Sequence, residues 1–192
     1  GRGQHLDIAL LDVAVAMNAN QASNYLVSGE SPARIGNTHP NLAPYEVFAC
    51  ADGHVILAIG NDTQFVAFCR LMGADWHLQP DFATNAGRLT HLKRLRPLLR
   101  GKLAAWRVEA LGRALDEHGI SWGNVNDMEQ VFAHPQVRHR QMLQTVDHPQ
   151  LGTLRLVRNP MVPAGRDAPV TPPPVLGPAA RPRTHQPVNQ ET

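Results

Sequence analysis

The chain has 192 residues, of which 43% are hydrophobic and 18% charged, and its formal net charge is +2. This composition is too apolar and too weakly charged for a disordered chain, and the length suffices for one hydrophobic core with a smaller second unit. No run of about 18–20 uncharged apolar residues occurs, so we expect a cytoplasmic protein with no transmembrane segment and no membrane partner.

The first predicted element is a strand over residues 4–10, where apolar residues recur at every second position. A helix over residues 11–27 follows, and Gly29 is typical of a C-terminal helix cap. A strand that begins so close to the terminus indicates that further chain preceded it. We therefore interpret the polypeptide as truncated.

The remaining elements are short and are delimited by turn residues and apolar periodicity. Asp52-Gly53 is typical of a hairpin turn, and Asn61 with Gln64 forms a capping-box pattern at the start of a helix. The expected elements are a loop over 31–44, strands over 45–50 and 54–60, helices over 61–73, 90–106 and 108–118, a short helix from 127, and strands over 142–146 and 153–157. The proline-rich residues after Asn159 should wrap over the surface or be partly disordered.

Residues 91–102 are the most basic stretch, with five lysine or arginine residues and no acid. One interpretation is a nucleic-acid-binding patch. The other is an amphipathic helix with a solvated face, because leucines recur there every three or four residues. We favour the helix, kinked or begun afresh at Pro97, and expect no nucleic-acid partner, since no aromatic residues are interleaved with the charges.

Neither the histidines nor the cysteines form a recognisable metal-binding or catalytic pattern. None of the ten histidines belongs to an HExxH motif, so we expect no metal. Cys50 and Cys69 are too few for a disulfide scaffold and lack CxxC spacing. We therefore predict neither a zinc site nor an activated thiol.

The segment with the most distinctive chemistry is residues 36–45. Glycine and proline constrain its backbone, while asparagine and histidine place compact donors and acceptors on a loop that leads into a buried strand. The pattern by itself is equally compatible with a binding loop and with a plain connecting loop. The candidate substrate-loop residues are Gly36, Asn37, His39, Pro40 and Asn41.

At least six blocks of residues agree, in order and in spacing, with one enzyme family. The blocks are Gly3-Gln4-x-x-Asp7-Ile-x-Leu10-Leu-Asp12, Gly36-Asn37-x-His39-Pro40-Asn41-x-x-Pro44-Tyr45-x-x-Phe48, Asp52-Gly53-x-x-Ile56, Gly60-Asn61-Asp62-x-Gln64-Phe65, Phe82-Ala-Thr-Asn85-x-x-Arg88, Gly119-Ile120, Gly123-x-Val125-Asn126-Asp127 and Pro135-Gln136-Val137-x-x-Arg140. Through them, residues 1–163 resemble the family III CoA-transferases, the group of formyl-CoA transferase and crotonobetainyl-CoA:carnitine CoA-transferase. After Gly177 the tail departs from the usual ending of that family.

The resemblance implies an enzyme that moves coenzyme A from an acyl-CoA thioester to a carboxylic acid through a covalent aspartyl intermediate, with no metal. Residues 36–44 would occupy the position of a loop that protects the intermediates from water. In the family, the nucleophilic aspartate and most CoA-binding positions lie upstream of the first block. Asp7 and Asp12 are therefore not candidate nucleophiles, and we expect this chain alone to be inactive.

The fold implied by the resemblance is α/β: a partial large domain, made of a strand, a helix and the C-terminal tail, with a smaller α+β domain that contains a short antiparallel sheet. Residues 1–44 would be the C-terminal part of the large-domain segment with the active-site loop. Residues 45–143 would form the small domain, and residues 144–192 the return to the large domain. Family members form dimers of interlocked rings, so we expect a homodimer or association with a missing N-terminal half.

Two alternatives stay open. The α-methylacyl-CoA racemases share the fold but resemble Gly-Gly-Ala-Pro-Phe-Tyr in this loop, whereas the segment from His39 to Tyr45 is similar to transferases that use succinyl-CoA and dicarboxylic or hydroxy-acid acceptors. We therefore favour a transferase and predict that His39 and Asn41 line the acyl pocket and donate hydrogen bonds to a carboxylate or to anhydride oxygens. The second alternative is a non-catalytic binding module that uses the basic helix.

Overall fold

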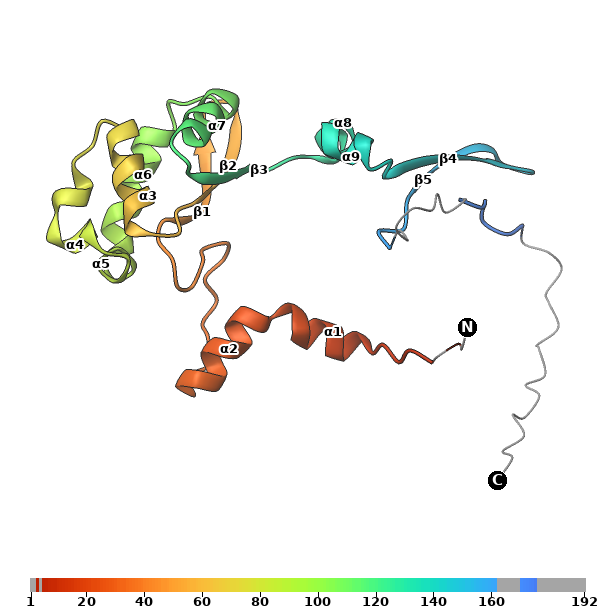
Figure 1. The fold of residues 1–192 in the computed structure, drawn as a ribbon, viewed down its shortest axis with the longest axis horizontal. Helices are drawn as coiled ribbons and strands as arrows, with labels where there is room; N and C mark the ends of the chain where they lie inside the picture. The colour runs from red at the N-terminus through yellow and green to blue at the C-terminus, as the bar shows by residue number, and fades with distance from the viewer. Residues whose placement is uncertain (1–2, 4, 162–169, 176–192) are drawn as a thin grey trace. The chain divides into compact units, whose positions relative to one another are not determined.

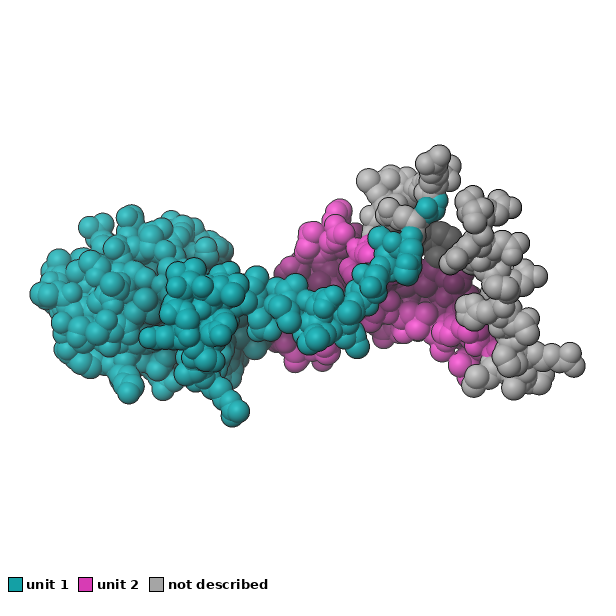
Figure 2. All heavy atoms as spheres, turned by 90° about the horizontal axis from the view of Figure 1, so that it is seen from below, with its two compact units in different colours: residues 1–125 teal, residues 126–192 magenta. Residues whose placement is uncertain are grey.

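The computed structural model describes residue 3, residues 5–161 and residues 170–175 (Figure 1). The chain divides into two compact units, residues 1–125 and 126–192 (Figure 2). Each unit combines short helices with one small antiparallel sheet. A mixed α/β fold with small antiparallel sheets is therefore confirmed.

Two helices open the first unit, α1 (Leu10–Met17) and α2 (Ala19–Ser28). The strand predicted over 4–10 is wrong where it can be seen, because residues 5–9 form no strand. A strand needs a neighbour that pairs with its backbone groups, and no described strand lies against this segment. The single predicted helix is divided at Asn18, and α2 ends at Gly29 in the predicted left-handed cap.

A three-stranded antiparallel sheet follows, in the order β1 (Tyr45–Cys50), β2 (Gly53–Ala58) and β3 (Ser121–Asn124). The first two strands form the predicted hairpin. The third was not predicted, because four residues are too few to show an alternation. It forms because the chain returns to β2, where Trp122 lies opposite Leu57.

The core of the first unit is built by the inner face of the sheet and by the helices between β2 and β3. These are α3 (Asp62–Leu71), the 3₁₀ turn η1 (Trp76–Leu78), α4 (Pro80–Ala83), α5 (Asn85–Thr90), α6 (Leu92–Leu103) and α7 (Val108–Glu117). Among the side chains with no more than 1% exposure are Phe48, Leu57, Ile59, Phe65, Phe68, Phe82, Leu95, Leu99, Leu103, Leu111 and Leu115.

Helix α6 carries the basic stretch and confirms the amphipathic interpretation. Leu95, Leu99 and Leu103 are fully buried, whereas the lysines and most arginines of the same helix are exposed. The helix does not begin afresh at Pro97 but runs through it without a break. Its leucine stripe packs into the core, which fixes where the positive charges lie.

The second unit contains α8 (Met128–Ala133), α9 (Pro135–His139), and a hairpin of β4 (Leu143–His148) and β5 (Gly152–Val157). The hairpin and the short helix are as predicted. Asp127 and Gln130 form the reciprocal bonds of a capping box, at 2.8 and 2.9 Å.

The tail prediction lies largely outside the described residues. Residues 170–175 are described and contain neither helix nor strand. None of the helices in the described part of the chain is long and apolar enough to cross a bilayer.

Candidate functional site

The loop over residues 36–44 connects α2 to β1 and is bonded back onto that strand. The side-chain oxygen of Asn37 accepts the backbone N–H of Val47 at 3.2 Å. The backbone N–H of His39 donates to the carbonyl oxygen of Tyr45 at 2.8 Å. The two bonds join the loop to the strand that follows it, so the loop has a defined path rather than being a free connection.

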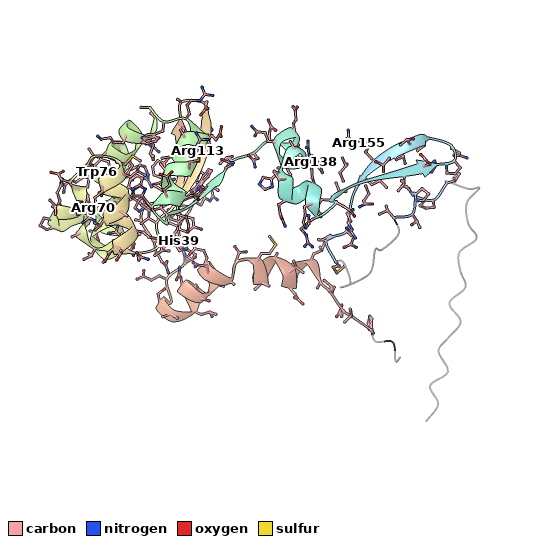
Figure 3. The ribbon with its side chains drawn as sticks, turned by 45° about the horizontal axis from the view of Figure 1, so that its top comes forward. His39, Arg70, Trp76, Arg113, Arg138 and Arg155 are labelled. Carbon is pink, nitrogen blue, oxygen red and sulfur yellow. The ribbon has the colours of Figure 1, made fainter. Side chains whose placement is uncertain are left out.

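The imidazole of His39, whose place in the fold Figure 3 labels, is held in one orientation. Its Nδ1 accepts the backbone N–H of Asn41 at 3.1 Å, and its ring stacks on that of Tyr45 with centroids 4.9 Å apart. A backbone amide can only donate, so the proton of the neutral ring resides on Nε2. Nε2 has no hydrogen-bond partner among the described residues. His39 therefore presents one N–H donor that a ligand can use.

Asn41 ties the loop to the helices on either side of it. Its side-chain amide forms two reciprocal hydrogen bonds with the amide of Asn24 on α2, each 3.1 Å long. Its backbone carbonyl oxygen accepts from Nδ2 of Asn85 at 2.8 Å. The predicted contact of Asn41 with a substrate stays a prediction; what the geometry gives it is a role in holding the loop.

Asn85 and Arg88 on α5 support the end of the loop at Ala43. The side-chain oxygen of Asn85 accepts the N–H of Ala43 at 3.0 Å, and Nε of Arg88 donates to its carbonyl oxygen at 2.6 Å. Arg88 is completely buried, forms an ion pair with Asp62 at 2.8 Å and lies over the ring of Phe65. Such complete pairing is what makes a buried guanidinium tolerable.

A second buried charge lies beside the loop at Glu46, which is 5% exposed. Nε of Arg96 on α6 lies 2.9 Å from both carboxylate oxygens, and the hydroxyl of Thr38 reaches one of them at 3.4 Å. The ion pair therefore joins β1, α6 and the loop. Arg96 has a structural partner here and is not a free cation of the basic stretch.

A second arginine of the basic stretch, Arg94, is also ion-paired, with Asp81 of α4. Lys93, Arg100 and Lys102 are exposed, and none of them forms an ion pair within the described part of the chain. Two of the three arginines in the basic stretch, Arg94 and Arg96, are thus ion-paired with acidic side chains of the first unit. This arrangement favours a structural helix over a nucleic-acid surface.

A shallow pocket of about 380 Å³ opens beside His39, between α2 and the loop. Gly36 lets the chain turn there, with a φ of 67° that suits glycine. The pocket is lined by Asn20, Gln21, Ile35, Gly36, Asn37, Thr38, His39, Pro40 and Tyr45. Four of the five candidate loop residues thus line one pocket, and the fifth, Asn41, fixes its wall.

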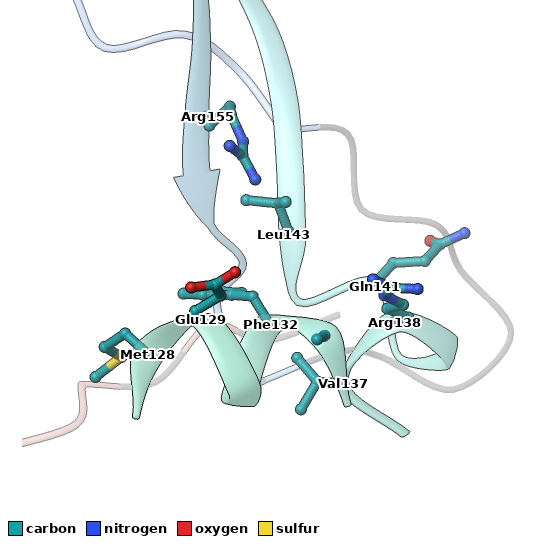
Figure 4. A pocket seen from close by; sticks show the side chains of 9 residues that line it. Met128, Glu129, Phe132, Val137, Arg138, Gln141, Leu143 and Arg155 are labelled. Atoms are coloured by element: carbon teal, nitrogen blue, oxygen red, sulfur yellow. The ribbon is translucent and has the colours of Figure 1, made fainter. Parts of the chain in front are cut away.

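The second unit has a larger groove of about 700 Å³ (Figure 4). Apolar side chains from α8, α9 and β4 line it together with Glu129, Arg138 and Arg155. The sequence predicted no site here. None of its three charged side chains has an ion-pair partner within the described residues.

The two cysteines have the character of packing residues. Burial raises the pKa of the Cys69 thiol to about 11, and burial followed by the charge of Asp52 raises the pKa of Cys50. A thiol that stays protonated is a poor nucleophile. Among the described residues, no group of three or more histidine, cysteine or acidic side chains could hold a metal ion.

Sequence reasoning missed the residues that complete the site from other elements. Asn85 and Arg88 were present in a matched block, but only the fold places them behind the loop. Asn20, Gln21 and Asn24 carried no signal beyond an asparagine-rich helix. The only hint was their spacing, which places these three side chains on one face of a helix.

The model of the family described as CoA-transferase family III matches residues 1–179 of the chain. A succinate–glutarate CoA-transferase from Agrobacterium fabrum is 39% identical over 163 residues, which are 84% of this chain and 41% of the relative. A succinyl-CoA:mesaconate CoA-transferase from Haloarcula marismortui is 33% identical and is matched over 78% of this chain and 37% of its own length. The chain thus spans about two fifths of the relatives that it matches.

The fold has a solved counterpart in a CAIB/BAIF family protein from Brucella suis. That structure superimposes with a TM-score of 0.69 at 38% sequence identity, over 86% of this chain and 43% of the other. The agreement covers most of the chain, so its fold is that of this structural group.

Proposed function

Because the chain belongs to CoA-transferase family III, we propose that it forms part of an enzyme that transfers coenzyme A from an acyl-CoA thioester to a carboxylic acid. The observation that carries the proposal is the loop, which presents the fixed Nε2–H donor of His39 beside a pocket. Relatives named for succinyl-CoA or for succinate and glutarate support a dicarboxylic substrate. Acyl-CoA and a carboxylic acid are thus the substrates of the proposed reaction.

The donor on His39 suits the chemistry of acyl transfer. When a carboxylate attacks a thioester carbonyl, negative charge develops on the carbonyl oxygen and the CoA thiolate leaves. An N–H already aimed at that oxygen stabilises the charge without having to reorganise. The stacking on Tyr45 and the bond from Asn41 fix the ring, which supplies this preorganisation.

We place the nucleophilic carboxylate outside this chain. The pocket lining contains no aspartate and no glutamate. Asp12 is exposed on α1, and Asp7 is exposed in the segment before it. The proposed aspartyl intermediate therefore requires a carboxylate from a further segment of the enzyme, in the same copy or in a second one.

The test is a chimera in which this chain replaces the segment that it matches in the Agrobacterium fabrum relative. We expect the chimera to transfer CoA from succinyl-CoA to glutarate, measured as glutaryl-CoA by chromatography. The variant His39→Phe keeps an aromatic ring on Tyr45 but removes the donor, and should lower kcat roughly tenfold or more.

A matched control is His139→Phe, because His139 is exposed in the second unit and lies outside both pockets. It should transfer CoA at the rate of the parent chimera. A folded chimera with no transfer would contradict the proposed function. Equal rates of CoA transfer by His39→Phe and by the parent chimera would show that His39 has no part in the proposed function.

A further inference from the structure

The pocket beside His39 has an unusual set of polar groups. Its lining contains no arginine, lysine, aspartate or glutamate, yet it includes the side-chain amides of Asn20, Gln21 and Asn37 together with the imidazole of His39. The first two come from α2 and the other two from the loop. Whatever binds there is recognised by neutral hydrogen-bonding groups.

The hydrogen bonds inside the protein determine which ends of these groups remain for a ligand. The oxygen of Asn37 is taken by the backbone N–H of Val47, which can only donate, so the NH₂ end of Asn37 is left. The same reasoning leaves the Nε2–H of His39, since Nδ1 is taken by the N–H of Asn41. Two groups of the loop are thereby fixed as donors.

On α2 the amide of Gln21 is used in the same sense, because its oxygen accepts from Nδ2 of Asn24 at 3.1 Å. The same nitrogen uses its second hydrogen on Asn41, so the oxygen of Asn20, 3.4 Å away, is not needed as an acceptor. Asn24 is itself held by Asn41. The NH₂ groups of Asn20 and Gln21 have no acceptor within the described part of the chain.

We propose that Asn20 and Gln21 of α2, together with Asn37 and His39 of the loop, bind a carboxylate group through neutral N–H donors. The inference rests on the proposed function and deepens it, because it assigns substrate contacts to α2. A carboxylate has only acceptor sites, which match the N–H donors that Asn20, Gln21, Asn37 and His39 place around the pocket.

The donor set also predicts specificity. A carboxamide of the same size would turn its own NH₂ toward these donors and leave hydrogen-bonding groups unpaired. The pocket should therefore bind a dicarboxylic acid and reject the corresponding diamide. The same carboxylate chemistry is found in a free acid and at the far end of a succinyl thioester.

The experiment is a side-chain amide NMR titration of the ¹⁵N-labelled 192-residue chain with glutarate, glutaramide, succinyl-CoA and CoA. We expect glutarate and succinyl-CoA to shift the side-chain amide signals of Asn20 and Gln21, and glutaramide and CoA to leave them unchanged. Shifts with glutarate alone would assign the site to the free acid, and shifts with succinyl-CoA alone to the thioester. Both outcomes support a carboxylate site.

Two variants test the contact itself. Gln21→Leu should weaken glutarate binding about fivefold, as the loss of one neutral hydrogen bond predicts. Gln21→Glu should weaken it further, because a second anion would face the carboxylate. Gln150→Leu, on the exposed turn of the hairpin in the second unit, is the matched control and should bind as the parent does. The backbone amide spectrum reports whether each variant is folded.

The inference is overturned if glutarate leaves Asn20 and Gln21 unshifted, or if folded Gln21→Leu and Gln21→Glu bind glutarate as tightly as the parent. A shift confined to His39 would overturn it while leaving the proposed function intact. Transfer by the chimera is measured separately, so failure of the proposed function is distinguishable from failure of this contact. Equal shifts with glutaramide would also exclude carboxylate recognition.

Discussion

At the scale of single residues, the two charged side chains buried in the first unit, Arg88 and Glu46, each have partners of opposite charge. Arg88 has no exposed surface and uses its donors on three backbone carbonyls and on Asp62. Glu46 is matched in the same way by Arg96. A buried charge without such partners would destabilise the fold by several kcal/mol, on the order of the desolvation penalty. The positions of these residues are therefore fixed by chemistry as much as by packing.

The ionisation of the buried residue Cys69 should make the stability of the fold depend on pH in a measurable way. Its pKa is raised from 9.0 to about 11, so the folded state holds its proton more tightly than the unfolded state does. The resulting stability is complete below pH 9 and is lost as the pH rises to 11. We expect the wild-type free energy of unfolding to fall by about 2 kcal/mol more than that of Cys69→Ala over this range.

The measurement is chemical denaturation of both proteins at several pH values. Cys69→Ala is less stable at every pH because it leaves a small cavity. The test is therefore how the difference in free energy of unfolding between the two proteins changes with pH. Every other ionisable group is common to the two proteins, so its contribution cancels in the comparison. Parallel pH profiles would show that the thiol has no such shift.

At the scale of elements, the loop over residues 36–44 has an irregular backbone that is hydrogen-bonded to three neighbouring elements. It is bonded to β1 through Asn37 and His39, to α2 through Asn41, and to α5 through Ala43. Irregular backbone keeps a fixed shape only when its polar groups are paired in this way. The site is therefore a product of several elements, although its residues are consecutive.

Asn85 is the attachment whose removal should loosen the loop most selectively. Its amide bonds both the N–H of Ala43 and the carbonyl oxygen of Asn41. Asn85→Ala should lower the free energy of unfolding by about 1–3 kcal/mol, because two backbone groups lose their partner. Hydrogen exchange at the N–H of Ala43 should become roughly tenfold faster or more, as local opening no longer has to break this bond.

A fitting comparison is Asn126→Ala, which removes an exposed asparagine amide in the second unit. Its exchange rates in the loop should equal those of the parent. If Asn85→Ala left the exchange of Ala43 unchanged, the loop would owe its order to other attachments, with Arg88 the first candidate.

At the scale of the whole molecule, the chain presents apolar surface that its own described residues do not cover. Neither α1 nor α2 has a buried residue. Leu10 and Val27 are each 90% exposed, and Met17 is 82% exposed. The chain also spans only about two fifths of its relatives. Both facts agree with the proposal that catalysis needs a segment beyond the residues described.

The corresponding prediction is that the chain by itself binds a carboxylic acid but does not transfer CoA. With succinyl-CoA and glutarate, no glutaryl-CoA should form above the buffer rate, because the proposed nucleophile is supplied from elsewhere. Product chromatography after a long incubation is the measurement, and the chimera serves as the active reference. Steady transfer by the isolated chain would reveal a nucleophile within it.

Local signals in the sequence determined the hairpin of β1 and β2, the amphipathic face of α6, the cap at Asp127 and the family itself. The first three depend on residues within a few positions of one another. The family depends on blocks of residues whose order and spacing can be read along the chain. The strand predicted over 4–10 was wrong because alternation alone supplies no pairing partner.

Only the tertiary structure decided what surrounds His39. The bonds that complete the site join Asn24 to Asn41, 17 positions apart, and Arg88 to Ala43, 45 positions apart. It also decided that β3 pairs with β2 and that Nε2 of His39 carries the free donor. Periodicity and turn chemistry act over one or two turns of chain, whereas these contacts depend on the path of the backbone between distant residues. The sequence by itself therefore determined the family and the candidate loop, and the fold decided which side chains complete the site.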